Sequence, residues 1–137
     1  MSQTVCLKEG QGLPRSHILR GRSAIISLFA EGQTFSQPPV RVIYRWVDAM
    51  EDVPVKVLFS VSKRNFKRAV QRNRIKRLMR EAWRRHYKLL ADYAAQKQKT
   101  LHIALIYSRT DEPRYDRLEN KIIQLIHRLS SSDEALA

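Results

Sequence analysis

The sequence predicts an α+β fold, in which a single mixed β-sheet is flanked by helices. Two stretches rich in β-branched and aromatic residues, 40–47 and 55–62, have the two-residue periodicity of strands, and a third strand is predicted at 101–108. Between the second and third strands lies a long segment whose apolar residues recur at helical spacing. This order favours a strand–helix–strand unit with further helices packed on one sheet.

The first helix is predicted to begin at Ser23, a residue type that commonly caps helix N-termini. It is predicted to end at Gly32, where a left-handed C-terminal residue belongs. Pro38-Pro39 then breaks the chain before the first strand, which leaves room for a short extra strand near Phe35. The apolar residues of the helix, spaced as one face, are Ile25, Ile26, Leu28 and Phe29.

Each of the two following strands presents one apolar face, because residues two apart lie on the same side of a strand. In the first strand these residues are Val40, Val42, Tyr44 and Trp46. In the second they are Val55, Val57, Phe59 and Val61. Only a short acidic turn, 48–54, separates the strands, so we predict that they pair with each other as antiparallel neighbours.

The long helix combines an apolar stripe with a cationic surface. The stripe consists of Ile75, Leu78, Met79 and Ala82. Just outside it runs an i, i+4 ridge made of Arg72, Lys76, Arg80 and Arg84. The helix is expected to run on to about Gln98. A last helix is predicted to start within 108–113, with Pro113 near its first turn. Its stripe consists of Leu118, Ile122, Leu125, Ile126 and Leu129.

The segment 63–88 carries most of the positive charge of the chain. It holds twelve of the 26 Lys and Arg but only one acid, Glu81, so it contributes +11 of the formal net charge of +13. Like charges at this density repel one another and cost stability, and no folding requirement explains them. They indicate a polyanionic partner, and at a sequence pI near 10.5 the usual polyanion is nucleic acid.

The composition narrows the class of protein further. A hydrophobic content of 43% with four glycines indicates a folded domain, predicted to span 1–137 with flexible tails at 1–12 and 130–137. The single cysteine, Cys6, excludes an internal disulfide. No apolar run approaches the ~20 residues of a membrane span, so we expect a cytoplasmic protein without membrane contact. The acids of the turn at 48–54, namely Asp48, Glu51 and Asp52, are interpreted as a solvated turn rather than a metal site.

The most specific motif is Arg72-Asn73-Arg74-Ile75-Lys76-Arg77, followed by Arg80, Glu81 and Ala82 and preceded by FSVSKR at 59–64. Together these residues resemble the signature of the protein subunit of bacterial ribonuclease P. The stretch 19–44 resembles the first helix and strand of that family, and the strand near Ile103 and the final helix follow in the same order. Many members have a glycine shortly before the Arg-Asn pair, whereas this chain has 66–70, FKRAV.

The resemblance implies partners and a reaction. The partners would be the catalytic RNA of ribonuclease P and precursor tRNA, cut at its 5′ end, with no obligate protein partner. The RNA and its Mg²⁺ would perform the hydrolysis, so the protein would bind no cofactor, hold no catalytic residue and be inactive alone. The family fold is ribosomal-protein-like and has a left-handed βαβ crossover, which is rare among proteins in general.

The resemblance and the charge pattern together assign two sets of residues. The predicted RNA-binding residues are Lys63, Arg64, Lys67, Arg68, Arg72, Asn73, Arg74, Lys76, Arg77, Arg80 and Arg84. The predicted cleft for the 5′ leader, between the sheet and the first helix, would be lined by Ile25, Phe29, Tyr44, Ser60 and Ser62. Aromatic side chains beside a basic groove stack on unpaired bases, a role for which Phe29, Phe35, Tyr44 and Trp46 are candidates. Packing is the competing interpretation of Phe29 and Trp46.

Two other functions compete with the ribonuclease P assignment. One is a ribosomal or RNA-chaperone protein with a similar α+β fold. The other is a DNA-binding helix protein, which the sequence disfavours because no short helix and tight turn precede the basic helix.

Overall fold

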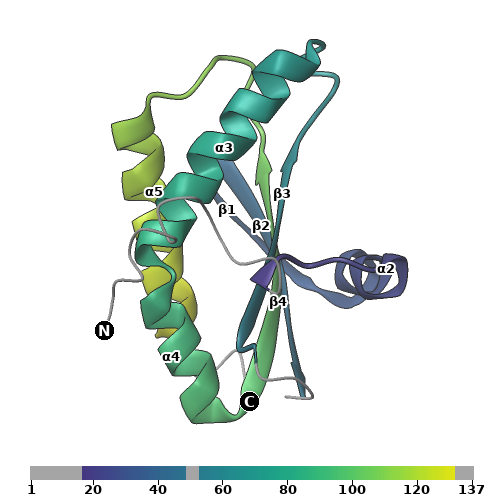
Figure 1. The fold of residues 1–137 in the computed structure, drawn as a ribbon, viewed down its shortest axis with the longest axis vertical. Coiled ribbons are helices and arrows are strands. Elements are labelled where there is room, and N and C mark those ends of the chain that lie inside the picture. The colour runs from purple at the N-terminus through teal and green to yellow at the C-terminus, as the bar shows by residue number, and fades with distance from the viewer. Residues whose placement is uncertain (1–16, 49–52, 132–137) are drawn as a thin grey trace.

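The computed structural model describes residues 17–48 and 53–131, which form one four-stranded sheet with helices on both faces (Figure 1). In chain order the elements are α2 (Arg22–Glu31), β1 (Gln33–Gln37), β2 (Val40–Asp48), β3 (Val55–Val61), α3 (Ala69–His86), α4 (Lys88–Lys97), β4 (Lys99–Tyr107) and α5 (Tyr115–Ser130). The α+β class, the order of the elements and the short strand near Phe35 are therefore confirmed. None of the described helices is both long and apolar enough to cross a membrane.

The sheet has the order β1-β2-β4-β3, and β4 lies in its interior. Ile103 of β4 is opposite Tyr44 in an antiparallel pairing and opposite Val57 in a parallel one. The predicted pairing of β2 with β3 is thus wrong, because β4 lies between them. The run of buried residues in β4 suits a strand covered on both faces, whereas in a strand open to water on one face buried and exposed residues would alternate. The sheet is mixed, as predicted.

The parallel strands β3 and β4 are joined by α3 and α4, which confirms the βαβ unit; its left-handedness stays a prediction. The single long helix expected here is two helices: α3 ends at His86 and α4 begins at Lys88, with Tyr87 (φ −73°, ψ −10°) between them. Figure 1 shows the axis changing direction between α3 and α4. Gln98, in a left-handed conformation, ends α4 at the predicted position.

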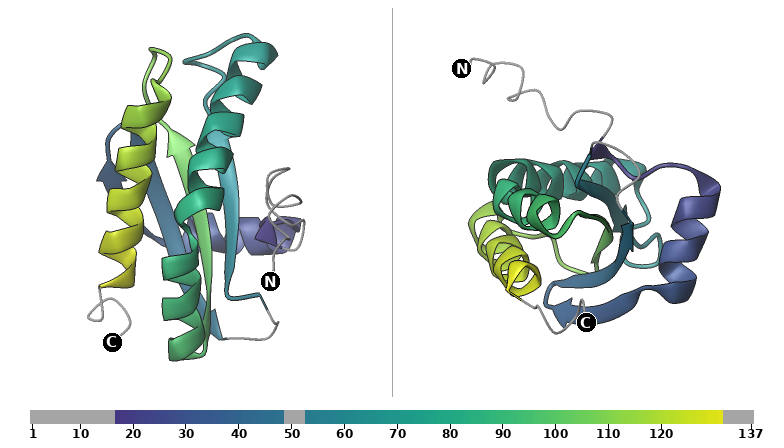
Figure 2. Two further views of the ribbon diagram at one scale, coloured as in Figure 1. Left: turned by 60° about the vertical axis from the view of Figure 1, so that its left-hand side comes forward. Right: turned by 90° about the horizontal axis from the view of Figure 1, so that it is seen from below.

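Two apolar cores lie on opposite faces of the sheet. The larger packs α3, α4 and α5 against one face, and all five predicted residues of the α5 stripe are buried in it. The smaller lies on the other face, where Leu28 of α2 meets Leu19, Ile43 and Ala104. Figure 2 shows α2 alone on its side of the sheet, opposite the three other helices. The face of the sheet beside α2 is therefore covered less completely than the face beneath α3 and α5.

Both ends of α2 differ from the sequence prediction. The helix starts at Arg22 and its cap is Gly21 (φ 97°), two residues before the predicted cap, so Ser23 lies inside the helix and is exposed. Gly32 is extended (φ −75°, ψ 157°) rather than left-handed. Glycine is needed here for a steric reason, because a Cβ at this position would lie 2.5 Å from the carbonyl oxygen of Leu28. The chain can thus pass directly from α2 into β1.

The start of α5 lies later than predicted. Its first residue is Tyr115 and its N-cap is Arg114 in an extended conformation, so Pro113 precedes the helix instead of lying in its first turn. The hydroxyl of Tyr107 donates to the carbonyl oxygen of Asp111 at 2.7 Å. This bond ties the loop before α5 to the end of β4.

Candidate nucleic-acid interface

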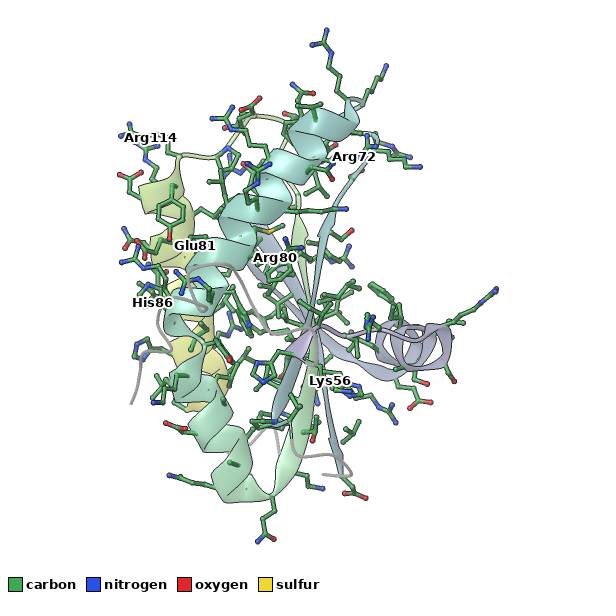
Figure 3. The ribbon with its side chains drawn as sticks, in the orientation of Figure 1. Lys56, Arg72, Arg80, Glu81, His86 and Arg114 are labelled. Carbon is green, nitrogen blue, oxygen red and sulfur yellow. The ribbon has the colours of Figure 1, made fainter. Side chains whose placement is uncertain are left out.

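The cations of α3 lie on two flanks of the helix with different surroundings. Arg72, Lys76 and Arg80 follow the flank toward β3, where the Arg80 guanidinium lies 5.8 Å from the ring centroid of Phe59. Figure 3 shows Arg72 and Arg80 on this side of α3, and Glu81 and His86 toward α5. The buried residues Ile75, Met79, Ala82 and Trp83 face the sheet, which places the cationic ridge at the edge of the core as the periodicity predicts.

The other cations of α3 are largely compensated by acids. On the flank toward α5, Arg74 pairs with Glu112 at 3.0 Å and Arg85 with Glu119 at 3.5 Å. Arg84 forms two hydrogen bonds to Glu81, and the bond lowers the pKa of that carboxyl below its ordinary value. Two of the predicted RNA-binding residues, Arg74 and Arg84, therefore already have acidic partners in the protein.

The loop before α3 is fixed by a dense set of hydrogen bonds. The Ser62 carbonyl accepts from the backbone N–H groups of Asn65 (3.2 Å) and Phe66 (3.1 Å), and the Ser62 hydroxyl accepts from Arg64 N–H. Phe66 is buried. Arg72 Nη1 donates to the carbonyl oxygens of Phe66 and Lys67, both at 2.8 Å. Arg72 thus positions the loop from the first turn of α3, a role that the charge pattern could not reveal.

The loop and the β3 flank of α3 together form a surface of unbalanced positive charge, which we call the open flank. Within residues 17–48 and 53–131, none of its cations lies within 4 Å of an acidic side chain. Asn73 and Arg77 are exposed beside it. These cations can form charge-assisted hydrogen bonds to phosphate without first breaking an ion pair. The open flank comprises Lys63, Arg64, Lys67, Arg68, Lys76 and Arg80.

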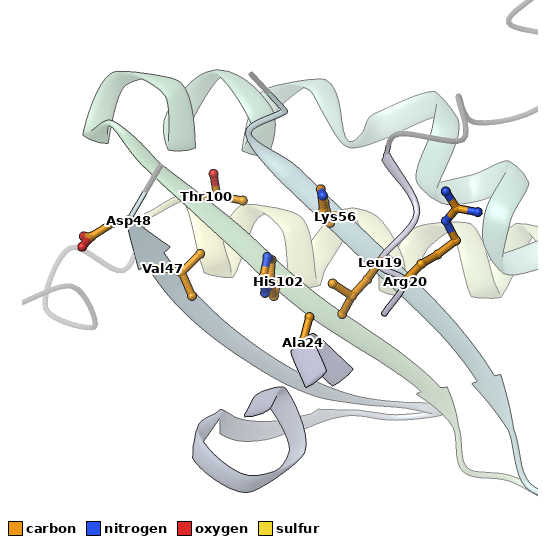
Figure 4. A pocket seen from close by; sticks show the side chains of 8 residues that line it. All are labelled: Leu19, Arg20, Ala24, Val47, Asp48, Lys56, Thr100 and His102. Atoms are coloured by element: carbon orange, nitrogen blue, oxygen red, sulfur yellow. The ribbon is translucent and has the colours of Figure 1, made fainter. Parts of the chain in front are cut away.

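A groove of about 390 Å³ opens on the other face of the sheet, beside α2 (Figure 4). Arg20 lies before α2, while Lys56 and His102 come from the neighbouring strands β3 and β4. Sequence reasoning missed these three residues, although the alternation of Lys56 with buried Val55 and Val57 already places it on the α2 face. The groove is lined by Leu19, Arg20, Ala24, Val47, Asp48, Lys56, Thr100 and His102.

The predicted leader-cleft residues do not all lie on this face. Ile25 packs on the smaller core, and Phe29 of α2 is 46% exposed. Ser60 alternates with the buried Phe59 and Val61, so it lies on the α2 face, whereas Ser62 holds the loop turn. Tyr44 belongs to the larger core, on the opposite face.

The environment of Tyr44 excludes the predicted stacking role. The side chain is 7% exposed, and the centroid of its ring lies 5.8 Å from that of Phe35. Its hydroxyl donates to the side-chain oxygen of Gln33. Phe35 and Trp46 also pack against the larger core, where Trp46 contacts Tyr93. Residues two apart on β2 share a face, so the pattern that makes Val40 and Val42 core residues does the same for Tyr44 and Trp46.

Of the three acids of the predicted turn, Asp48 lies within the described residues. Asp48 pairs with Lys99 at 2.9 Å, and the hydrogen bond from Lys99 lowers the pKa of that carboxyl. Glu51 and Asp52 lie outside the described residues, as do Cys6 and most of the predicted tails.

Comparison with known proteins identifies the family. The family model described as Ribonuclease P matches residues 13–130. The ribonuclease P protein component of Porphyromonas gingivalis is 35% identical over 121 residues, which cover 88% of each chain. That of Chlorobaculum tepidum is 37% identical over 134 residues, covering 91% of this chain and 87% of the relative. The chain belongs to the ribonuclease P protein family.

Solved structures of ribonuclease P proteins share the fold. The protein from Thermotoga maritima has a TM-score of 0.64 at 22% identity, and the match covers 81% of this chain and 96% of that one. The protein from Staphylococcus aureus has a TM-score of 0.60 at 17% identity, covering 84% and 95%. Family membership confirms the first of the three predicted functions: the chain is a protein component of ribonuclease P, a ribonucleoprotein of tRNA processing.

Proposed function

We propose that this ribonuclease P protein binds the RNase P RNA through the open flank, and that RNA carries out the catalysis. A protein component of ribonuclease P works with the RNase P RNA. The observation that carries the proposal is the uneven distribution of acids around α3. Glu112 and Glu119 compensate cations on the α5 flank, whereas the described acids leave the open flank uncompensated. Such a surface is stabilised when phosphates approach it.

The chemistry of the open flank suits phosphate. An arginine presents several N–H groups in a planar fork that matches two phosphate oxygens, and lysine adds a point charge. The hydrogen bonds at Ser62 and Arg72 hold the loop in place before RNA arrives, so less conformational entropy is lost on binding. If six to ten cations contact phosphates, affinity should fall by roughly three to five decades between about 50 and about 200 mM salt.

The groove beside α2 is the proposed site for the 5′ leader of precursor tRNA. Phe29 does not line the groove itself, but it offers an exposed ring on α2, and stacking on a base contributes ~1–3 kcal/mol. Lys56 and Arg20 line the groove, where they can contact the leader backbone. The leader and the RNase P RNA would then occupy opposite sides of β3, with its α2 face toward the leader and the open flank toward the RNase P RNA.

The protein's contribution to catalysis would be electrostatic. Two RNA molecules repel each other strongly, and a cationic surface between them reduces the repulsion. The Mg²⁺ used in hydrolysis would be held by the RNA, so the protein would lower the Mg²⁺ concentration that the complex requires. No second protein would be needed.

Reconstitution from purified parts tests this assignment. The protein alone should leave precursor tRNA intact, whereas protein and RNase P RNA together should release the 5′ leader at a Mg²⁺ concentration at which the RNA alone is slow. Raising Mg²⁺ should partly replace the protein. Cleavage at the 5′ junction by RNA-free protein, abolished by Asp48→Asn, would contradict the proposal.

A further inference from the structure

A second cationic groove lies at the start of α5, away from both surfaces assigned above. Its volume is about 420 Å³. It is formed by the turn between β1 and β2, the end of β4 and the first turns of α5. Figure 3 shows Arg114 at the start of α5, on the opposite side of the molecule from α2.

The walls of this groove are held rigidly. Both the backbone N–H and the hydroxyl of Ser108 donate to the carbonyl oxygen of Pro39, at 2.9 and 3.0 Å, which fixes the β1–β2 turn to the end of β4. The Tyr107 hydroxyl fixes the next part of the loop through Asp111. Pro38, Pro39 and Pro113 add apolar wall with restricted backbone torsions. The groove therefore exists before any ligand binds.

Charge gives the groove a preference for anions. Four cations and two carboxylates line it, an excess of two positive charges. Glu112 is already engaged by Arg74, and Arg114 lies 3.7 Å from Asp116. Arg109, Arg117 and Lys121 have no acidic side chain within 4 Å among the residues that the structure describes. Arg117 and Lys121 are one helical turn apart and both line the groove, so two neighbouring phosphates could be contacted at once.

We infer that this groove binds the sugar-phosphate backbone of the RNase P RNA, an inference that rests on the proposed function. Phosphates would contact Arg109, Arg117 and Lys121, and sugars or unpaired bases would pack on the proline wall. The Arg74–Glu112 pair joins the groove to α3, so an RNA lying along α3 can continue into it. The groove beside α2, which is proposed for the 5′ leader, lies on the other face of the sheet. The occupant is therefore the RNase P RNA rather than the precursor tRNA.

Binding of the cognate RNase P RNA transcript, without precursor tRNA, tests the inference. Arg117→Ala/Lys121→Ala should reduce the slope of log affinity against log salt by about 1.4 to 1.8, the value for two lost phosphate contacts on single strands or duplex. The matched control is Lys88→Ala/Lys97→Ala on α4, which lies at the other end of the molecule (Figure 1). The control removes the same charge and should leave the slope nearly unchanged. Equal slopes for the two double variants would overturn the inference.

A tethered cleavage reagent identifies the RNA directly. This experiment uses the complex of the protein with RNase P RNA and precursor tRNA. With Cys6 replaced by serine, an iron chelate on Thr110→Cys, beside the groove, should cut the RNase P RNA at a discrete position. The same chelate on Lys88→Cys should not cut there. Cuts confined to precursor tRNA, or none, would refute the inference. The proposed function is tested separately, by Lys76→Ala/Arg80→Ala on the open flank. It would be contradicted if this variant left RNA affinity unchanged, whatever the result for the groove variant.

Discussion

Arg72 donates two hydrogen bonds from one nitrogen, to the carbonyl oxygens of Phe66 and Lys67, and so links the first turn of α3 to the loop before it. Hydrogen bonds from a charged donor contribute about 1.5–3 kcal/mol, less where water competes, and Arg72 is only half-buried. Arg72→Ala should therefore lower the free energy of unfolding by about 1–2 kcal/mol.

Urea denaturation checks this effect. Asn73→Ala is the control, because Asn73 is exposed and adjacent, and its substitution should change stability by less than about 0.5 kcal/mol. Equal stabilities for the two variants would show that Arg72 serves RNA binding alone.

Phe29 and Tyr44, both predicted to line the leader cleft, should behave differently. Phe29→Ala should weaken binding of precursor tRNA to the reconstituted complex more than binding of mature tRNA, because only the precursor carries an unpaired leader. Tyr44→Ala should instead cost about 3–5 kcal/mol of stability, as for other buried aromatic residues, without favouring either tRNA. Affinity for both tRNAs and urea denaturation measure the two effects. A precursor-specific loss in a stably folded Tyr44→Ala protein would contradict the structure.

Gly32 and Ser23 test the two ends of α2. A Cβ at Gly32 would also lie 3.0 Å from the Tyr44 carbonyl oxygen and from Ile43 Cγ2, so Gly32→Ala should destabilise the protein by about 1–3 kcal/mol. Ser23→Ala should lower the free energy of unfolding by less than about 0.5 kcal/mol, because Ser23 lies inside the helix. If Ser23 were the N-cap, its loss would lower this free energy by about 1 kcal/mol. Urea denaturation of both variants distinguishes these cases.

Tyr107 should make stability depend on alkaline pH. Burial raises the pKa of its phenol from 10.0 to about 12. Because the folded protein holds this proton more tightly than the unfolded chain, the stabilisation is complete below pH 10.0 and is lost as the pH rises to about 12. The stability difference between the wild type and Tyr107→Phe should therefore shrink across this interval. A difference that stays constant with pH would show that Tyr107 ionises equally in both states.

The sequence predicted features that repeat along the chain. Burial follows the periodicity of 3.6 in a helix and 2 in a strand, so the stripe around Ile122 and the faces of β2 and β3 could be identified from local pattern. The same pattern placed the cations of α3 outside its core.

Features that depend on distant parts of the chain could not be predicted in this way. The short turn favoured pairing of β2 with β3, but β4, which follows β3 in the chain only after α3 and α4, lies between them. Whether Arg74 and Arg85 are compensated depends on Glu112 and Glu119, which only folding brings near. For Tyr44, the alternation with Ile43 indicated the correct face of the sheet, whereas the expectation that its ring stacks on RNA did not take that face into account.

The salt dependence of RNase P RNA binding tests the open flank most directly. Two double variants of α3 remove the same charge: Lys76→Ala/Arg80→Ala on the open flank and Arg74→Ala/Arg85→Ala on the acid-paired flank. Melting temperatures establish that both variants fold. The first should reduce the slope of log affinity against log salt by about 1.4 to 1.8, and the second by less than half as much. Equal reductions, or a larger one for Arg74→Ala/Arg85→Ala, would contradict the assignment of RNA binding to the open flank.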